Sequence, residues 1–151
     1  MKKIILLIAV FFALNSCTTS SETDRNFVVL PIESVEMPTN YTIGNISKIK
    51  INYKRPTECH IFNGFYIADD EIDSLKKTIA VQSVKLNNSN CQADDSLFEV
   101  FLDFKPTVAG TYTFKFWLGL NGNGSDEYET YVVEVLKIIK LFQLEYRATD
   151  I

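Results

Sequence analysis

Residues 106–118 read Pro-Thr-Val-Ala-Gly-Thr-Tyr-Thr-Phe-Lys-Phe-Trp-Leu, the clearest structural pattern in a chain of 151 residues. Within this stretch, large apolar side chains recur at every second position from Tyr112 to Leu118. A period of two is typical of a β-strand that turns one face to an apolar core. The proline and glycine that precede it suit a turn. We therefore expect a strand over 112–118, with Trp117 on the face opposite to the core.

Six other stretches carry a comparable apolar pattern, regular in three of them and less regular in the others: 27–36, 49–53, 58–68, 77–86, 98–104 and 131–135. Turn-forming combinations such as Lys105-Pro106 and Asn121-Gly122-Asn123-Gly124 separate the stretches. Seven short strands with turns at this spacing predict an all-β fold, an antiparallel β-sandwich. The 11 Phe and 7 Tyr supply ample bulk for its core.

The segment that leads into 112–118 resembles the corner between strands E and F of immunoglobulin-like domains. There a small residue stands two positions before a Tyr, and an apolar residue stands two positions after it, as Gly110, Tyr112 and Phe114 do here. The resemblance implies an immunoglobulin-like sandwich in which the Tyr112 hydroxyl bonds to the upstream backbone. Val108 stands where an Asp is usual, so the charged partner of the corner is missing. The alternative is that Tyr112 is simply another core aromatic residue.

The chain begins with Met1-Lys2-Lys3, followed by 11 apolar residues from Ile4 to Leu14. A basic start and an apolar middle too short to span a bilayer predict a secretory signal peptide, an N-terminal signal helix over residues 1–16.

The residues Leu14-Asn15-Ser16-Cys17 resemble the lipobox of bacterial lipoproteins, although Asn15 is less usual than Ala, Ser or Thr at its position. The resemblance implies cleavage before Cys17, acylation of that residue and a stable membrane anchor, since two or more acyl chains hold a protein to a bilayer. An ordinary cleaved leader is the alternative. Residues 17–26 then form a flexible tether, and 27–151 the sandwich with a C-terminal extension. By analogy with lipoprotein sorting, Thr18 favours the outer membrane.

The charge balance is acidic, with 15 basic and 19 acidic residues, and it becomes more acidic without Lys2 and Lys3. An acidic chain without a basic patch argues against nucleic acid as a partner. His60 is the only imidazole, so a catalytic triad or a histidine metal site is hard to build. The carboxylates of 69–73 crowd a predicted turn, where solvated side chains are usual. We expect no enzyme activity, no cofactor and no resident metal.

Cys59 and Cys91 remain once Cys17 is assigned to lipid, and outside the cytoplasm two such cysteines normally pair. A disulfide between them would close a loop of 33 residues, worth ~3.5–4 kcal/mol in the chain-entropy model. A metal or redox pair is the alternative. It is disfavoured because Cys59 and His60 are adjacent in an expected strand and so point to opposite faces.

Trp117 is the candidate binding residue, because an aromatic ring on the outer face of a sheet can stack on a sugar or a partner side chain. The alternative is that a loop or the C-terminal tail covers it.

Residues 121–127 offer alternate oxygens for a calcium ion, but Asn-Gly repeats are also ordinary hairpin turns. The tripeptides at Ser74 and Ser96 fit a short glycosylation pattern. The segment 136–146 fits either one helical face or a continuing strand.

Over about residues 45–136, the cysteine, glycine and aromatic pattern is similar to that of small uncharacterised lipoproteins of Bacteroidota. This resemblance implies location and fold but no activity. We expect a membrane-anchored, non-enzymatic binding or structural module of the cell envelope, with an envelope protein or a glycan as its partner. A carbohydrate-binding or adhesion module is the alternative function.

Overall fold

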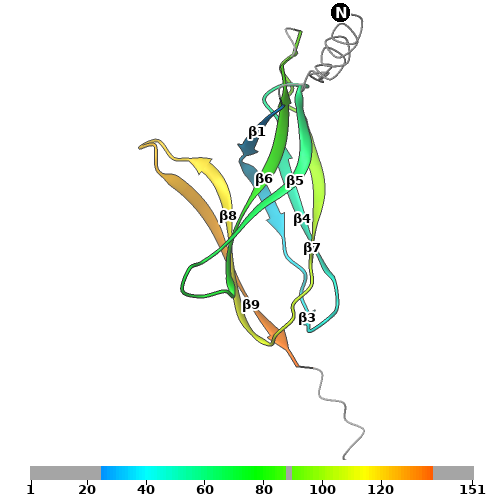
Figure 1. The fold of residues 1–151 in the computed structure, drawn as a ribbon, viewed down its shortest axis with the longest axis vertical. Helices are drawn as coiled ribbons and strands as arrows, with labels where there is room; N and C mark the ends of the chain where they lie inside the picture. Colours follow the sequence, from blue (N-terminus) through cyan, green and yellow to red (C-terminus); the bar gives the residue numbers. More distant parts are fainter. Residues whose placement is uncertain (1–24, 88–89, 138–151) are drawn as a thin grey trace, which may run out of the picture.

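A computed structural model describes residues 25–87 and 90–137 (Figure 1). Alternating apolar residues form strands throughout, and the described residues contain no helix. The nine strands are β1 (Arg25–Leu30), β2 (Ile32–Glu36), β3 (Tyr41–Thr42), β4 (Ser47–Lys54), β5 (His60–Asp69), β6 (Lys76–Leu86), β7 (Leu97–Phe104), β8 (Gly110–Leu120) and β9 (Asp126–Leu136).

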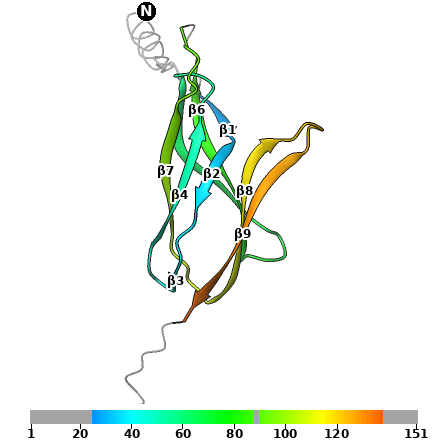
Figure 2. The ribbon, with the colours of Figure 1, turned by 180° about the vertical axis from the view of Figure 1, so that it is seen from behind.

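The strands form two sheets that pack as a sandwich (Figures 1 and 2). The large sheet has the order β1-β6-β8-β9-β3, with β5 added to β6, and the small sheet has the order β2-β4-β7. The β8–β9 hairpin extends away from the body of the sandwich beside β1 in both views. The all-β, two-sheet architecture expected from the sequence is confirmed.

Three details of the predicted fold are wrong. The expected strand over 27–36 is two strands, because the chain leaves the large sheet at Pro31 and enters the small one at Ile32. The two-residue strand β3 was also missed, so nine strands replace the expected seven. The sandwich is not wholly antiparallel either, since β6 pairs with β8, and β3 with β9, in parallel.

The core lies between the sheets and is built from the alternating residues of β4, β6 and β8. Ile49, Ile51, Phe114 and Phe116 are at most 1 % exposed. Phe104 of the small sheet packs edge-on against Phe114 of the large sheet, with ring centroids 4.9 Å apart. Such buried aromatic contacts hold the two layers together.

The Tyr112 corner has the hydrogen bond that was expected. Tyr112 is 3 % exposed, and its hydroxyl donates to the Val108 carbonyl at 3.3 Å. Gly110 has φ +144°, and a Cβ there would lie 3.1 Å from Leu75 Cδ1. A glycine is therefore needed where the chain enters β8.

Cys59 and Cys91 form the disulfide predicted from the sequence, with their Cα atoms 5.5 Å apart. Cys59 precedes β5 of the large sheet, and Cys91 lies in the connection that leads to β7 of the small sheet. Arg55 reinforces this end of the sandwich, because its Nε donates to Asp94 at 2.6 Å and its guanidinium lies 4.4 Å from the centre of the Phe98 ring.

The expected signal helix over 1–16, the lipidated Cys17 and the segment 138–151 lie outside the described residues. β1 begins at Arg25, so the last two residues of the expected tether, Arg25 and Asn26, belong to a strand paired with β6.

Candidate functional site

The outer face of the large sheet carries large apolar side chains. In β6, Ile79 and Val81 face the core, so Ala80 between them faces outward. The residues of β1 and β5 that pair with Ala80, Gln82 and Val84 lie on the same outer side. Trp117 of β8 and Tyr128, its partner in β9, also lie there. We call the following set the aromatic face: Phe27, Val29, Ile61, Tyr66, Trp117 and Tyr128.

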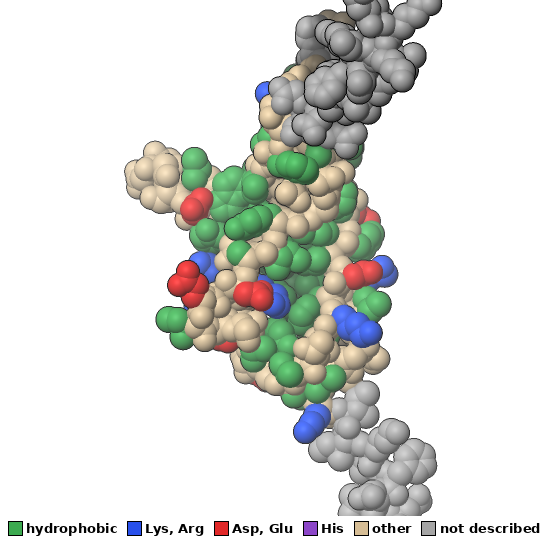
Figure 3. All heavy atoms as spheres, in the orientation of Figure 1, with side chains coloured by type: hydrophobic (Ala, Val, Ile, Leu, Met, Phe, Trp, Pro, Cys, Tyr) green, Lys and Arg blue, Asp and Glu red, His purple; other side chains and the backbone are tan. Residues whose placement is uncertain are grey.

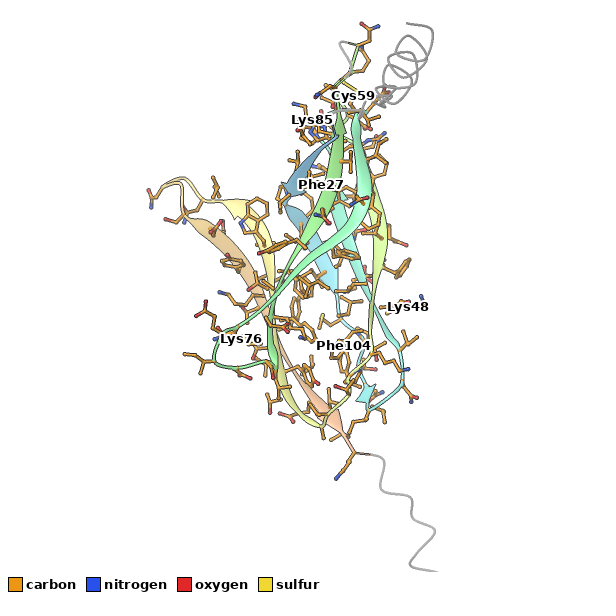
Figure 4. The ribbon with its side chains drawn as sticks, in the orientation of Figure 1. Phe27, Lys48, Cys59, Lys76, Lys85 and Phe104 are labelled. Carbon is orange, nitrogen blue, oxygen red and sulfur yellow. A yellow bond between two sulfur atoms is a disulfide. The ribbon has the colours of Figure 1, made fainter. Side chains whose placement is uncertain are left out.

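Four members of the aromatic face are strongly exposed, with Phe27 at 64 %, Tyr66 at 49 %, Ile61 at 47 % and Val29 at 41 %. Figure 4 labels Phe27 on β1, on the part of the molecule beside the projecting hairpin. Apolar groups gathered on one face of a sheet, rather than scattered singly, are typical of an interaction surface.

Trp117 lies at the root of the β8–β9 hairpin and is half-buried. Its Nε1 donates to Asp126 Oδ1 at 2.8 Å, which fixes the orientation of the indole ring. Tyr128 stands directly opposite Trp117 in the β8–β9 ladder. The Lys115 ammonium lies 4.2 Å from the centre of the Tyr128 ring, so a cation is stacked on the second aromatic group.

Tyr66 approaches these two residues from the other side of β6. Burial raises the pKa of Tyr128, and the neighbouring side chains of Asp126 and Tyr66 raise it further, so Tyr66 lies in the neighbourhood of Tyr128. Ala80 is paired with Tyr66 of β5. Ile79, the residue before it, is paired with Phe116 of β8. Although it faces outward, Ala80 is only 3 % exposed. Neighbouring side chains on the outer face therefore cover Ala80.

The hairpin bends at the edge of this site. A register shift separates Trp117 from Gly119, and Gly119 has φ +107°, with Pro31 Cβ 3.4 Å from the position of a Cβ. A side chain at 119 would be strained because of this positive φ, although its Cβ would make only an ordinary contact with Pro31. The pairing of β8 with β6 ends at Phe116, just before this register shift, and beyond it the hairpin extends beside β1 (Figures 1 and 2).

The other sequence candidates have structural partners. Asn121 Oδ1 accepts the backbone N–H groups of Asn123 and Ser125 at 2.9 and 3.0 Å, as an ordinary turn does, rather than being directed at an ion. His60 is 6 % exposed, and its Nδ1 lies 2.9 Å from Thr57 Oγ1. Over residues 25–87 and 90–137, no group of three His, Cys, Asp or Glu side chains is placed to hold a metal ion.

The acidic turn after β5 is held by its own backbone. Asp70 accepts the N–H groups of Ile72 and Asp73 at 3.1 Å each. These two hydrogen bonds lower the pKa of Asp70, as does the nearby charge of Lys76. Hydrogen bonds from Ser96 and then from Arg55 likewise lower the pKa of Asp94. Ser74 and Ser96, the candidate glycosylation sites, are both exposed.

Other hollows lie elsewhere among the described residues. One of about 630 Å³ runs between residues 37–42 and β9, and two of about 210 and 360 Å³ open between the sheets near Phe104. Figure 3 shows hydrophobic side chains on the floor of the gap between the sheets.

Sequence reasoning identified Trp117 but missed Tyr66, Tyr128 and Phe27. The missing information was pairing, because a shared face becomes visible only when β1, β5, β8 and β9 are placed around β6. The alternation in β5 is also broken by a register shift between Phe62 and Phe65, which hides the face to which Tyr66 belongs.

Among the described residues, no helix has the length and apolar character needed to cross a membrane. Comparison of the chain with protein-family models, with curated proteins and with solved structures finds no match.

Proposed function

We propose that this chain is a non-enzymatic binding module of the bacterial cell envelope, anchored in the outer membrane by lipid on Cys17. The aromatic face is the observation that carries the binding function. It gathers six large side chains on one side of a sheet, where a sandwich ordinarily presents polar groups to solvent. The lipobox at Leu14–Cys17 supports the anchor.

The sandwich is proposed to be of the immunoglobulin-like type. The Tyr112 corner and its hydrogen bond to Val108 support this assignment. The parallel pairing of β6 with β8 departs from the antiparallel arrangement expected of that type of fold.

The anchor is tested by labelling cells with a radioactive fatty acid. The chain should take up label, and the variant Cys17→Ser should not. Equal labelling of both chains would show that Cys17 carries no lipid. Cys59→Ser is the matched control, because it removes a cysteine that we assign to the disulfide and should leave labelling unchanged.

The binding face is tested by placing a photo-crosslinking amino acid at position 66 or at position 48 in intact cells. Position 66 lies on the aromatic face, whereas Lys48 lies on the outer face of the small sheet, where it pairs with Asp103 at 2.8 Å. Crosslinks to a discrete envelope component are expected from position 66 alone. Equal crosslinking from both positions would contradict a face-specific binding role.

Carbohydrate binding is the second candidate function, and Trp117 is the residue that favours it. An indole ring held by its bond to Asp126 is pre-oriented, which lowers the entropic cost of stacking a sugar on it. Asp126 bonds to the indole, and Tyr128, which stands opposite Trp117, carries a hydroxyl and the stacked Lys115 ammonium. Such polar groups can fix a ligand's orientation.

Screening glycans against Trp117→Ala tests this candidate. A sugar bound by the parent chain should lose at least about tenfold in affinity, as expected when a central aromatic contact is removed. Phe101→Ala is a matched control, since Phe101 is a 50 % exposed aromatic residue on the small sheet. Binding that is unchanged in Trp117→Ala, or lost equally in both variants, would argue against the sugar site.

A further inference from the structure

β9 presents a free edge along most of its length. Within residues 25–87 and 90–137, the side of β9 away from β8 is paired only at Val135 and Leu136, which meet β3 in parallel. Figure 2 shows β3 near the end of β9, while the rest of β9 continues into the projecting hairpin. Residues 126–134 therefore have one side to which a further strand can be added.

The backbone groups of Val132 are directed at this free edge. The Thr113 N–H donates to the Leu75 carbonyl at 3.0 Å, immediately before β6, so Thr113 turns its backbone groups away from β9. Thr113 and Val132 are partners in the β8–β9 ladder. The two residues of an antiparallel pair exchange both hydrogen bonds or neither, so Val132 turns its N–H and C=O away from β8.

The other end of β9 gives the same direction. The Leu136 carbonyl accepts the Ile43 N–H at 3.5 Å, so Leu136 turns its backbone groups towards β3. Backbone directions alternate along a strand, and Glu134 and Val132 therefore share the direction of Leu136. Their N–H and C=O groups are a template for a strand supplied from outside.

A groove of about 630 Å³ runs along this edge, between β9 and the segment 37–42 that leads from β2 to β3. Its floor is fixed, because Met37, Tyr131 and Val133 pack against the core. The Tyr131 hydroxyl also lies 3.3 Å from the Val35 carbonyl of β2, which ties β9 to the strand before the segment. A groove that exists before its ligand arrives lowers the cost of binding.

The outer side of this edge is apolar and acidic. Val132 is 64 % exposed and Leu136 is 67 % exposed, and the exposed Glu134 lies between them on the same side. β9 contains no Lys or Arg, and its four acidic residues are Asp126, Glu127, Glu129 and Glu134. Over residues 25–87 and 90–137, none of these carboxylates forms an ion pair. The edge thus carries negative charge that no base neutralises.

This charge selects between occupants. A second copy that offered its own β9 would bring further acidic residues and no base to the edge. The free edges of β5 and β7 would do the same, since both strands contain acidic residues and neither contains Lys or Arg. Like charges on paired strands are destabilising, whereas a basic strand complements the edge.

We propose that the groove binds a basic, extended segment of a partner protein, which adds to the edge of β9 as a further strand. The main chain of the segment pairs with the free backbone groups of Val132 and Glu134. A Lys or Arg of the segment meets Glu134, and an apolar side chain two positions away meets Val132. This site is distinct from the aromatic face and does not depend on the function proposed for that face.

Selection from a phage library of random ten-residue peptides, with the full chain in detergent as the target, tests the proposal. Peptides with a Lys or Arg and an apolar residue two positions away should be enriched. One such peptide, made synthetically, is then the probe. Val132→Pro removes the N–H at the edge, and an edge strand tolerates Pro there because no ladder bond is lost. This variant should bind the probe about tenfold more weakly, whereas the matched control Val132→Thr should bind nearly as well as the parent.

The charge is tested with Glu134→Gln, which keeps a side-chain oxygen for its bond from Thr111. The variant should bind the probe several-fold more weakly and with less dependence on salt, because one ion pair is lost. Glu71→Gln is the matched control, since Glu71 is an exposed acid in the turn after β5, and it should match the parent. Equal losses in both variants would contradict a contact at Glu134.

Amide exchange shows whether the edge is free and where the probe binds. In the protein alone, the Val132 and Glu134 amides should exchange rapidly, and the probe should slow them roughly tenfold. Exchange in β8 should be equal in the parent and all variants, which establishes that each is folded.

Slow exchange at Val132 in the protein alone would overturn the proposal, as would a library without enriched basic peptides or undiminished binding by Val132→Pro. Protection that grows with protein concentration, together with a dimeric mass, would overturn it in favour of a second copy.

Discussion

The two outer faces of the sandwich differ in chemistry: ion pairs predominate on the small sheet, although Phe101 is exposed there, and apolar side chains predominate on the large sheet. On the small sheet, lysines of β4 pair with acidic residues of both neighbouring strands, as Lys50 does with Glu36 at 2.8 Å and Glu99 at 3.3 Å. The large sheet instead presents Phe27, Tyr66 and their neighbours.

Exposed ion pairs contribute little stability, but they keep a face wetted and leave no charge unmatched for a partner. Apolar rings exposed to water bring no benefit to the isolated fold. The difference teaches that fold stability does not explain the aromatic face, and this is why the proposed binding function is placed there.

The largest expected effect comes from removing the disulfide that links the large sheet to the connection leading to the small one. Replacing both Cys59 and Cys91 by Ala removes the link between the start of β5 and the connection to β7. The free energy of unfolding should fall by about 2–4 kcal/mol, because the unfolded chain regains the entropy of an open loop. Denaturant unfolding measures this loss. A loss below about 1 kcal/mol would mean that Arg55, Asp94 and the surrounding rings hold this end without the disulfide.

An intermediate effect on stability is expected from Tyr41, which packs against Phe104. Burial raises the pKa of Tyr41 to about 12, and Tyr41 is 4 % exposed, with its ring 6.0 Å from that of Phe104. The proton is thus held more tightly in the folded chain than in the unfolded one. The stability associated with it is complete below pH 10 and is lost as the pH rises from 10 towards 12.

Tyr41→Phe should therefore flatten the alkaline part of the stability curve. Relative to its value at pH 8, the stability of the parent chain should fall by up to about 2–3 kcal/mol more than that of the variant as the pH approaches 12. Unfolding monitored by denaturant at each pH provides the measurement. Parallel curves for the two proteins would show that Tyr41 ionises as freely in the fold as outside it.

The smallest changes in stability, and the sharpest comparison, come from one variant on each face. Lys48→Ala should alter the unfolding free energy by less than about 1 kcal/mol, because its side chain is largely exposed. Tyr66→Ser should lower it by about 1 kcal/mol, because about half of the ring is buried. Only Tyr66→Ser should reduce retention on a phenyl column, since it removes an exposed ring. Equal retention of both variants would show that the aromatic face does not determine the hydrophobic adsorption of the protein.

The sequence predicted the regular strands well because their period is local. The alternations of Ile49 with Ile51 and of Phe114 with Phe116 needed no knowledge of partners to identify core residues. The switch at Pro31 was missed because apolar residues continue across it, although a proline inside an expected strand is a usable signal. β3 is too short to carry a period. Which strands are parallel, and hence that Tyr66 and Trp117 share a face, depends on long-range pairing that no local pattern records.

The pairing of β1 has a mechanical consequence for a chain held at Cys17. Any pull transmitted through the tether enters the fold at Arg25 and acts along β1, whose six residues are all paired with β6. A force in that direction loads the hydrogen bonds of the ladder together, in shear, instead of opening them one after another. An anchor attached there would let the domain bear tension between a membrane and whatever the aromatic face holds, with β6 at the centre of the large sheet receiving the load.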